Sequence, residues 1–418
     1  MLPDYPIYKM MGEIYMTSEK LSEYIRLYNN ELFNKCIPFW LEKAADSTHG
    51  GVYCSLDRDG NIYSTDKSVW LTGRCAWTFA HLCNVYQPKP EWLMLAKSCL
   101  DFLNKHCIDT DGRMFFLVTE DGRPLRKRRY YFSECFYIIA NAEYYAATGN
   151  TDALQKAREY FDLVMRIYHE PSSDPYFVTP KGISSTRDTA DFASPMIILN
   201  VANIMRRCDR ENTEKYDAAA SELLQTLLGT FWNKEYNVFM EHVLKDTNRP
   251  AENCSLLRLV NPGHTIEACW FILDEAVYEG NAALVSTVEK IFTNTFRMGW
   301  DEKYGGLFYF RDVLGYPPEA IESNMKLWWP HCEALIAAAK LYAQTGKEEY
   351  SDIFETVTDY AFKHFSSTCG GEWYGYLCRN GELLEPSCIG NPFKGAFHVP
   401  RMLIEVKKTF ERIQEKEK

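Results

Sequence analysis

The sequence predicts an all-α fold, an (α/α)6 barrel or toroid of six helix pairs with short β-hairpin loops. A short aromatic hairpin signature recurs six times along the 418 residues, and stretches with helical periodicity flank each copy. The steps between successive copies are 62, 62, 62, 69 and 66 residues. A fixed period of this size indicates one supersecondary unit used repeatedly. The steps join the aromatic anchors Tyr53, Phe115, Phe177, Phe239, Phe308 and Tyr374.

The first unit shows why each element is expected. Residues 18–45 have helical periodicity and precede the signature GGVYCSLDRDGNIY, which begins at Gly50. In residues 69–86 apolar side chains such as Trp70 and Trp77 recur at three- and four-residue spacings, which is the pattern of a buried helical face. One unit is therefore a helix, a hairpin and a second helix.

The five later units repeat this order. Gly149 and Gly346 follow two of the expected helices, at the position where glycine commonly caps a helix C-terminus. The remaining helices are expected over residues 91–107 and 132–147, 153–169 and 195–207, 216–232 and 264–278, 282–297 and 328–344, and 348–365 and 393–415.

The helix pairs must pack on one another, because no pair can bury its apolar face alone. An open helical array is the alternative to a ring, but it would need polar capping repeats at both ends. Here the last unit is as aromatic as the first. The sequence therefore favours closure into a ring. The repeat has no Pro/Ser-rich linker, so we expect a single domain over residues 1–418.

Composition narrows the class of protein. Aromatic residues make up 15% of the chain, which suits a carbohydrate pocket as well as a packed core. The net charge of −11 argues against a nucleic acid or an anionic membrane as partner. No run of 18 apolar residues predicts a membrane span, and the N-terminal sequence lacks the pattern of a secretory signal.

Cysteine and histidine usage points to a reducing compartment and to chemistry without a metal. The 14 cysteines do not cluster into CxxC pairs, so we interpret them as small buried side chains of a cytoplasmic protein. The nine histidines form no HxxxH or HExxH motif. We therefore expect no catalytic metal.

The unusual polar residues fall at the starts of the second helices of the units. In a closed toroid these starts converge at one mouth, where helix N-termini add positive potential that suits an anionic intermediate. The candidates are Arg74, Glu134, Asn200, His264, Glu267, Trp329, His331, Glu333, His398 and Arg401.

Several candidates also have a structural interpretation. A histidine on a buried helix is usually a hydrogen-bonded core residue, but His264 and His398 follow Pro/Gly-marked loops and open aromatic helices. Arg74 is a charge on an apolar face, which is costly unless it is paired. A salt bridge to Glu134 or Glu333 is its structural interpretation.

Two chemistries remain open from the residues alone. Two histidines and an arginine suit proton abstraction next to a carbonyl, with one base on each face and a cation on the enediolate. Paired carboxylates such as Glu267 and Glu333 would instead suit glycoside hydrolysis. The number of histidines at the mouth favours proton abstraction.

Eight motifs resemble one family from end to end, over about residues 38–401. They are FWLEKAADSTHGGVYCSLDRDG, VWLTGRCAW, RRYYFSECFY, NPGHTIEACWFI, GWDEKYGGLFYF, MKLWWPHCEA, GEWYGYLCRNG and PFKGAFHVPR. The chain thereby resembles the N-acylglucosamine 2-epimerase family, whose animal members are also called renin-binding proteins. The family's (α/α)6 barrel agrees with the repeat.

The resemblance implies an isomerase that interconverts N-acetylglucosamine and N-acetylmannosamine by proton transfer at C2. His264 and His398 would be the acid/base pair, Arg74 would hold O1, and Glu333 would be a functional position. Glu267 would support His264. The other pocket candidates are Trp329, His331, Asn200, Glu134 and Arg401.

The resemblance also leaves alternatives. Enzymes of the same fold epimerise β-1,4-linked disaccharides or isomerise mannose, and a non-enzymatic interaction role is a further alternative. Members of the family bind ATP as an activator that is not consumed, and no other cofactor is expected. Lys181 and Arg187, in the loop over residues 179–188, would contact this nucleotide, although a mobile active-site loop is the equal alternative. Family members are commonly homodimers, so a homodimer is expected.

Overall fold

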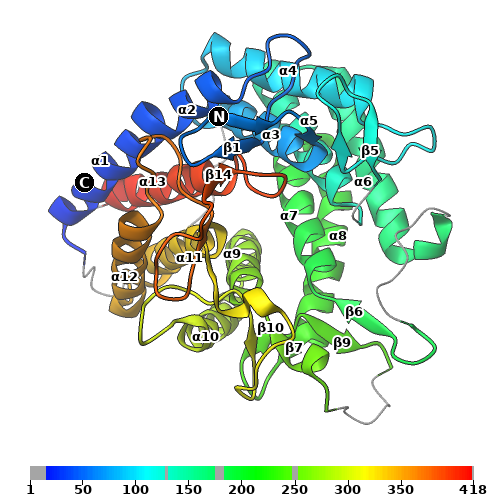
Figure 1. Ribbon diagram of the computed structural model, residues 1–418. Helices are drawn as coiled ribbons and strands as arrows, with labels where there is room; N and C mark the ends of the chain where they lie inside the picture. Colours follow the sequence, from blue (N-terminus) through cyan, green and yellow to red (C-terminus); the bar gives the residue numbers. More distant parts are fainter. Residues whose placement is uncertain (1–15, 128–129, 175–182, 247–252, 417–418) are drawn as a thin grey trace.

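The inner helices of the fold stand side by side around a central axis and form its inner wall (Figure 1). The computed structural model describes residues 16–127, 130–174, 183–246 and 253–416. Each inner helix packs against the next, and the last packs against the first, so the ring is closed. The inner helices are α3 (Val69–Val85), α5 (Phe132–Thr148), α7 (Ala193–Cys208), α9 (Pro262–Glu279), α11 (Trp328–Thr345) and α13 (His398–Lys416).

A second layer of helices surrounds this ring. The first outer helix is split, because a π-helical turn over Glu31–Cys36 separates α1 (Ser18–Asn30) from α2 (Ile37–Lys43). Another π-helical turn, Leu227–Phe231, extends α8. The other outer helices are α4 (Pro90–His106), α6 (Thr151–His169), α8 (Thr213–Thr226), α10 (Ala282–Gly299) and α12 (Glu348–His364).

The packing of the outer layer confirms the closed (α/α)6 barrel and excludes the open array. Helix α4 packs on α3 and α5, and α6, α8, α10 and α12 pack on α5, α7, α9 and α11 in turn. Helix α1 packs on α13, so the first and last described helices lie side by side (Figure 1).

Burial explains why the two layers have different sequences. Inner helices are covered on nearly all sides, so α11 carries small, fully buried residues such as Ala334 and Ala338 along its length. Outer helices bury one face only. In α6 the buried residues recur at helical spacing: Ala153, Leu154, Ala157, Phe161, Val164 and Ile167.

Short antiparallel strands join neighbouring units at one end of the ring. Strand β1 (Ser55–Asp57) of the first unit pairs with β14 (Cys388–Gly390) of the last unit. The other pairs between units are β3 (Lys67–Ser68) with β4 (Leu117–Val118), β6 (Thr189–Asp191) with β9 (His242–Leu244), β10 (Leu259–Val260) with β11 (Arg311–Asp312), and β12 (Lys326–Leu327) with β13 (Tyr376–Leu377).

The remaining short elements complete the hairpins and loops. Strands β2 (Ile62–Ser64) and β5 (Pro124–Arg126) extend two of these sheets, and β7 (Trp232–Asn233) pairs with β8 (Val238–Phe239). The anchor Phe177 of the third hairpin signature lies outside the described residues. Within the described ranges, 3-10 turns span Pro171–Ser173, Arg210–Asn212, Ser255–Arg258 and Ile321–Asn324.

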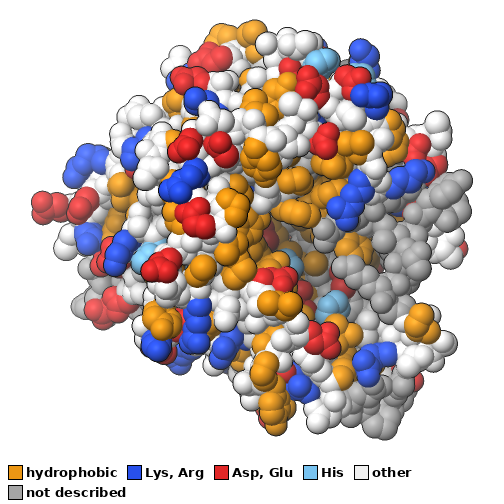
Figure 2. Space-filling model, viewed as in Figure 1, with side chains coloured by type: hydrophobic (Ala, Val, Ile, Leu, Met, Phe, Trp, Pro, Cys, Tyr) orange, Lys and Arg blue, Asp and Glu red, His pale blue; other side chains and the backbone are white. Residues whose placement is uncertain are grey.

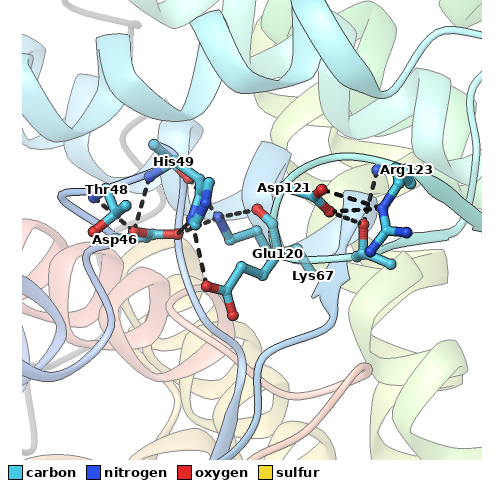
Figure 3. A network of polar contacts seen from close by, with 9 residues as sticks. Asp46, Thr48, His49, Lys67, Glu120, Asp121 and Arg123 are labelled. Carbon is cyan, nitrogen blue, oxygen red and sulfur yellow. Dashed lines mark hydrogen bonds and ion pairs between the residues drawn. The ribbon is translucent and has the colours of Figure 1, made fainter.

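A buried ion pair ties the first hairpin to the start of its inner helix (Figure 3). The Lys67 ammonium donates to a carboxylate oxygen of Asp46 at 2.6 Å and to the carbonyl oxygens of Gly50 and Glu120 at 2.7 and 2.9 Å. The lysine is fully buried. Such a charge is tolerated because each of its donors has an acceptor.

Three other units use equivalent ion pairs. Lys326 meets Asp301 in the fifth unit, and Lys394 meets Glu372 in the sixth. In the second unit the charges are reversed, since the hairpin residue Arg113 pairs with Glu134 of α5. We call these four pairs the hairpin–helix ion pairs. They hold the hairpins over the helix starts that form the mouth of the barrel.

All 14 cysteines are free thiols, and ten of them are buried, which agrees with the interpretation of most as small core side chains. In the part of the chain that the structure describes, no helix combines the length and the apolar character needed to cross a membrane.

Candidate active site

A cavity of about 390 Å³ opens where the inner helices begin. In Figure 2 the same face is hollowed at its centre, and apolar side chains surround the hollow. Aromatic residues such as Trp70, Phe136 and Phe397 form much of its wall. The predicted site residues that line it are Arg74, Asn200, His264, Glu267, Trp329, His398 and Arg401.

The loop before α9 fixes the position of His264. Asn261 caps this helix by accepting a hydrogen bond from the backbone N–H of His264 at 3.1 Å, and Pro262 occupies the first helical position. His264 therefore lies in the first turn and reaches the cavity. Its Nδ1 is 2.9 Å from Oε1 of Glu241, which precedes β9.

His398 is the first residue of α13 and reaches the cavity from another unit. Its Nδ1 is 2.8 Å from Oε1 of Glu333, on the neighbouring helix α11. A carboxylate can only accept, so Nδ1 carries the proton and the other ring nitrogen, Nε2, is a base when the ring is neutral.

Arg401 joins the two buried carboxylates of the site. Its Nη2 donates to Oε1 of Glu267 at 2.5 Å and to Oε1 of Glu333 at 2.7 Å. Glu333 also accepts from Nε1 of Trp270 at 2.8 Å. The ligand atoms of Glu267, Glu333 and His398 lie within 4.8 Å of one another, but the guanidinium of Arg401 already binds both carboxylates. The arginine therefore already neutralises these carboxylates, and the three side chains do not form a vacant metal site.

The two histidines have opposite electrostatic environments. Burial, together with the positive charges of Arg74 and Arg401, lowers the pKa of His398 well below its ordinary value. Burial also lowers the pKa of His264, but the carboxylates of Glu241, Glu267 and Asp191 together outweigh it, so the net shift is upward. At neutral pH one imidazole is therefore held neutral, while the other is biased toward the protonated form.

Arg74 is held by aromatic rings rather than by a carboxylate. Its guanidinium carbon lies 4.0 Å from the ring centre of Phe136 and 4.8 Å from that of Phe397. Among the described residues no ion pair of Arg74 is found, and its buried Nε has no hydrogen-bond partner. The alternative of a salt bridge to Glu134 or Glu333 is therefore wrong for this structure. A buried, unsatisfied donor next to a cavity is suited to bind an oxygen of a ligand.

Trp329 lies beside both histidines. Its ring centre is 5.2 Å from that of His264 and 5.9 Å from that of His398. The neighbouring Trp328 also lines the cavity. An indole face at this place suits the C–H face of a sugar placed between two proton-transfer groups.

Three predicted site residues do not line the cavity, namely Glu333, whose contacts are described above, and His331 and Glu134. His331 is fully buried, donates from Nδ1 to the carbonyl oxygen of Leu327 at 2.7 Å, and accepts the N–H of Leu307 on Nε2 at 2.9 Å. Both ring nitrogens are therefore used within the protein. Glu134 is also buried, and its Oε1 accepts from Arg113 and from the backbone of Met114. In the structure the side chains of His331 and Glu134 each hold a hairpin and do not line the cavity, and their assignment to the pocket stays a prediction.

The predicted nucleotide contacts cannot be placed together. Lys181 lies outside the described residues. Arg187 lies in the segment before β6, and its backbone N–H donates to the carbonyl oxygen of Ile183 at 2.8 Å. The assignment of both residues to a nucleotide stays a prediction.

Sequence reasoning missed two residues that contact the site. Glu241 lies 23 residues before His264, in the hairpin of the same unit, so no local motif links them. The signal that could have found it is the recurrence of charged residues in the hairpins, such as Asp46 and Asp301. Trp270, one turn after Glu267 on α9, was included only within a motif and not as a partner of Glu333.

The fold and the cavity together define an (α/α)6-barrel sugar epimerase. The model of the N-acylglucosamine 2-epimerase family matches residues 50–396. The N-acylglucosamine 2-epimerase of Rattus norvegicus is 36% identical over 397 residues, which are 92% of each chain. The chain belongs to the N-acylglucosamine 2-epimerase family and is an isomerase.

Solved structures support the fold at lower identity. The cellobiose 2-epimerase of Spirochaeta thermophila has a TM-score of 0.80 at 22% identity, and the match covers 94% of this chain and 98% of that one. A D-mannose isomerase has a TM-score of 0.75 at 19% identity, with 96% and 100% covered.

Proposed function

We propose that the protein interconverts N-acetylglucosamine and N-acetylmannosamine. The observation that carries this proposal is a pair of histidines from different units, His264 and His398, which lie beside Trp329 in one cavity with the unpaired guanidinium of Arg74. The choice of N-acylated monosaccharides rests on the 36% identity to the rat enzyme, against 22% and 19% for the disaccharide and mannose enzymes.

The proposed reaction is a proton exchange at C2 of the open-chain sugar. One imidazole removes the C2 proton, and its electron pair delocalises onto the aldehyde oxygen to give an enediolate. Arg74 donates to this oxygen as its negative charge develops. The other imidazole then returns a proton to C2 from the opposite face, so configuration is inverted and no net proton is consumed.

The opposite pKa shifts support a division of labour. His398, held neutral, is ready to accept the C2 proton in one direction, and His264, biased toward protonation, is ready to donate from the other face. In the reverse direction the roles exchange, as microscopic reversibility requires. Because His398 donates through Nδ1 to Glu333, its Nε2 is the nitrogen that accepts.

The remaining residues bind and orient the sugar in this proposal. Glu267 and Arg401 line the cavity and are held to each other, so they offer hydroxyl groups a fixed acceptor and donor. Trp329 supplies the stacking face, and Asn200 lines the cavity from α7. Proton transfer by these groups needs no cofactor, and we expect a chelator to leave the rate unchanged.

The test is proton NMR of the purified protein with N-acetylmannosamine in D2O. We expect N-acetylglucosamine that carries deuterium at C2. If the protein converts a β-1,4-linked disaccharide or mannose but not N-acetylmannosamine, its activity is instead that of one of the structurally similar enzymes. A protein that exchanges no C2 proton in any of these sugars would contradict the proposal.

The finer features implied by the family stay proposals with direct tests. ATP activation predicts a higher rate on adding ATP, with no ADP formed. The homodimer predicts twice the chain mass in light scattering. A single domain predicts one cooperative unfolding transition, and a cytoplasmic protein predicts that its cysteines stay reduced.

A further inference from the structure

We infer that Glu241 is a positioning residue for His264, which fixes the tautomer of the imidazole and holds its proton ready for transfer. The inference deepens the proposed function, because the proton in question is the one that His264 exchanges with C2. Glu241 itself is not among the residues that line the cavity.

The contact determines which nitrogen of His264 faces the sugar. The carboxylate of Glu241 accepts only, so the hydrogen bond of 2.9 Å must come from an N–H at Nδ1. Nε2 is therefore the nitrogen left for proton transfer. Without this acceptor the ring could adopt either neutral tautomer, and only one of them has a free Nε2 lone pair.

Three carboxylates act on His264, and Glu241 is the one bonded to it. The other two are Glu267, on the same helix, and Asp191, in β6. Glu267 is bonded to Arg401, and Asp191 accepts from the backbone N–H and the hydroxyl of Ser194. Both are thus partly compensated by other donors, which leaves Glu241 as the direct counterion of the imidazolium.

The fold holds Glu241 from both sides. Its backbone N–H donates to the carbonyl oxygen of Leu259 at 2.9 Å, and its own carbonyl oxygen accepts from the N–H of Phe192 at 3.0 Å. The segment continues into β9, which pairs with β6 of the preceding unit. The backbone at Glu241 is therefore anchored to two other stretches of chain, residues 189–192 and Leu259, as an orienting group requires.

The repeat gives an independent reason to assign this role. In the four hairpin–helix ion pairs the partners are 21, 21, 25 and 22 residues apart, and Glu241 and His264 are 23 apart. The fourth unit therefore has the same link between hairpin and helix start. Here the cation is an imidazole instead of a lysine, and its side chain is 27% exposed, whereas those of Lys67 and Lys326 are fully buried. In the fourth unit, the ion pair that is structural elsewhere thus contains a group, the imidazole of His264, that can titrate near neutral pH and reach the cavity.

The decisive measurement is the titration of His264 in the sugar-free protein. Carbon-13-labelled histidine gives one NMR signal for each ring, and the signal that disappears in His264→Asn identifies the residue. In the wild type we expect a midpoint above the ordinary histidine value of about 6.5, and in Glu241→Gln a midpoint lower by about one unit or more. This measurement needs no turnover, so its result does not depend on whether the proposed substrate is correct.

Turnover distinguishes positioning from mere stability. We expect Glu241→Gln to lower kcat about 10- to 100-fold with little change in KM, and to move the pH profile of kcat in the direction of the NMR midpoint. Asp301→Asn is the matched control, because it removes the carboxylate of the equivalent pair in the fifth unit. This control should lower the melting temperature and leave the His264 midpoint and the pH profile unchanged.

A His264 midpoint that is the same in the wild type and in Glu241→Gln would overturn the inference. If Glu241→Gln does not fold, Glu241→Asp decides, because the shorter side chain keeps the charge but moves it away from Nδ1. We expect an intermediate midpoint for Glu241→Asp, and an unchanged one would equally overturn the assignment.

Discussion

Gly263 and Trp329 are in such close contact that a β-carbon on the glycine would lie 2.5 Å from the indole ring. Gly263 immediately precedes His264, and Trp329 lies beside both histidines. The absence of a side chain at position 263 therefore sets how closely α9 approaches α11 at the mouth of the barrel. The NPGH motif therefore needs glycine at this position. Any larger residue would collide with the indole ring and force Trp329 to move.

Gly263→Ala is expected to damage catalysis by displacing the Trp329 ring from its place beside the histidines. We expect kcat/KM to fall at least 10-fold, with a loss of about 1–3 kcal/mol in the free energy of unfolding from overpacking. Steady-state kinetics and urea unfolding measure the two effects. Gly112→Ala is a useful comparison, since a β-carbon there meets no atom within 4 Å, although its φ of +80° makes alanine strained. Wild-type kinetics for Gly263→Ala would show that Trp329 has no role in turnover.

Glu333→Gln is expected to reduce turnover by changing the tautomer of His398. The amide can present its NH2 group to Nδ1, which would then lose its proton to Nε2 and leave no base toward the cavity. We expect kcat to fall roughly 10²- to 10⁴-fold, which is the range for loss of a positioned general base. Far-UV circular dichroism and the melting temperature serve as folding controls. A decrease in affinity alone, with kcat retained, would instead make Glu333 a binding residue.

The sequence predicted the barrel well because the repeat reflects the buried faces of the inner helices. Aromatic anchors at nearly constant spacing mark the hairpins, and each inner helix begins shortly after one of them. The π-helical turn over Glu31–Cys36 was not predicted, since it interrupts a segment whose apolar spacing is helical throughout.

The site was harder to predict, because polar residues near a helix start can serve either a ligand or a hairpin. His264 and His398 reach the cavity, whereas His331, three residues into α11, has both nitrogens bonded to backbone groups. Sequence position does not separate these cases, because the distinction depends on which way the hairpin folds back. Glu241 is the opposite case, a residue of the site that the sequence did not reveal. Its hydrogen bond to His264 becomes visible only when the fourth hairpin is seen folded over the start of α9.

Arg74→Lys is expected to remove most activity while keeping the positive charge. The planar guanidinium lies against Phe136 and Phe397 and can present two donors to neighbouring oxygens, which a lysine ammonium at the end of a flexible chain cannot copy. Burial lowers the pKa of Arg74 to about 9, so it remains charged at neutral pH. We expect kcat to fall about 100-fold or more. Near-wild-type rates would remove Arg74 from the stabilisation of the enediolate.

Replacing one histidine at a time should separate exchange from epimerisation. In His264→Ala the remaining His398 can still remove and return a proton on its own face. We therefore expect His264→Ala to incorporate deuterium slowly at C2 of one epimer in D2O, without converting it to the other. For His398→Ala we expect the same slow exchange in the other epimer. Proton NMR of each sugar with each variant gives the four rates. Full conversion by either variant would show that a single base serves both faces, while unfolded variants would make these histidines core residues.

The stability of the protein at mildly acidic pH should depend on His331. Burial lowers the pKa of His331 to about 3, and Nε2 must stay unprotonated to accept the N–H of Leu307. Between pH 6.5 and 3 the unfolded chain therefore binds a proton at this position that the folded protein does not, so stability falls as the pH decreases. From pH 7 to pH 5 this single group should cost about 2 kcal/mol of unfolding free energy. His331→Gln cannot titrate, so the variant should be less stable than the wild type at pH 7, and this difference should shrink by about 2 kcal/mol at pH 5. Urea unfolding of both proteins at the two pH values measures this change, and an equal difference at both would show that His331 is protonated in the fold.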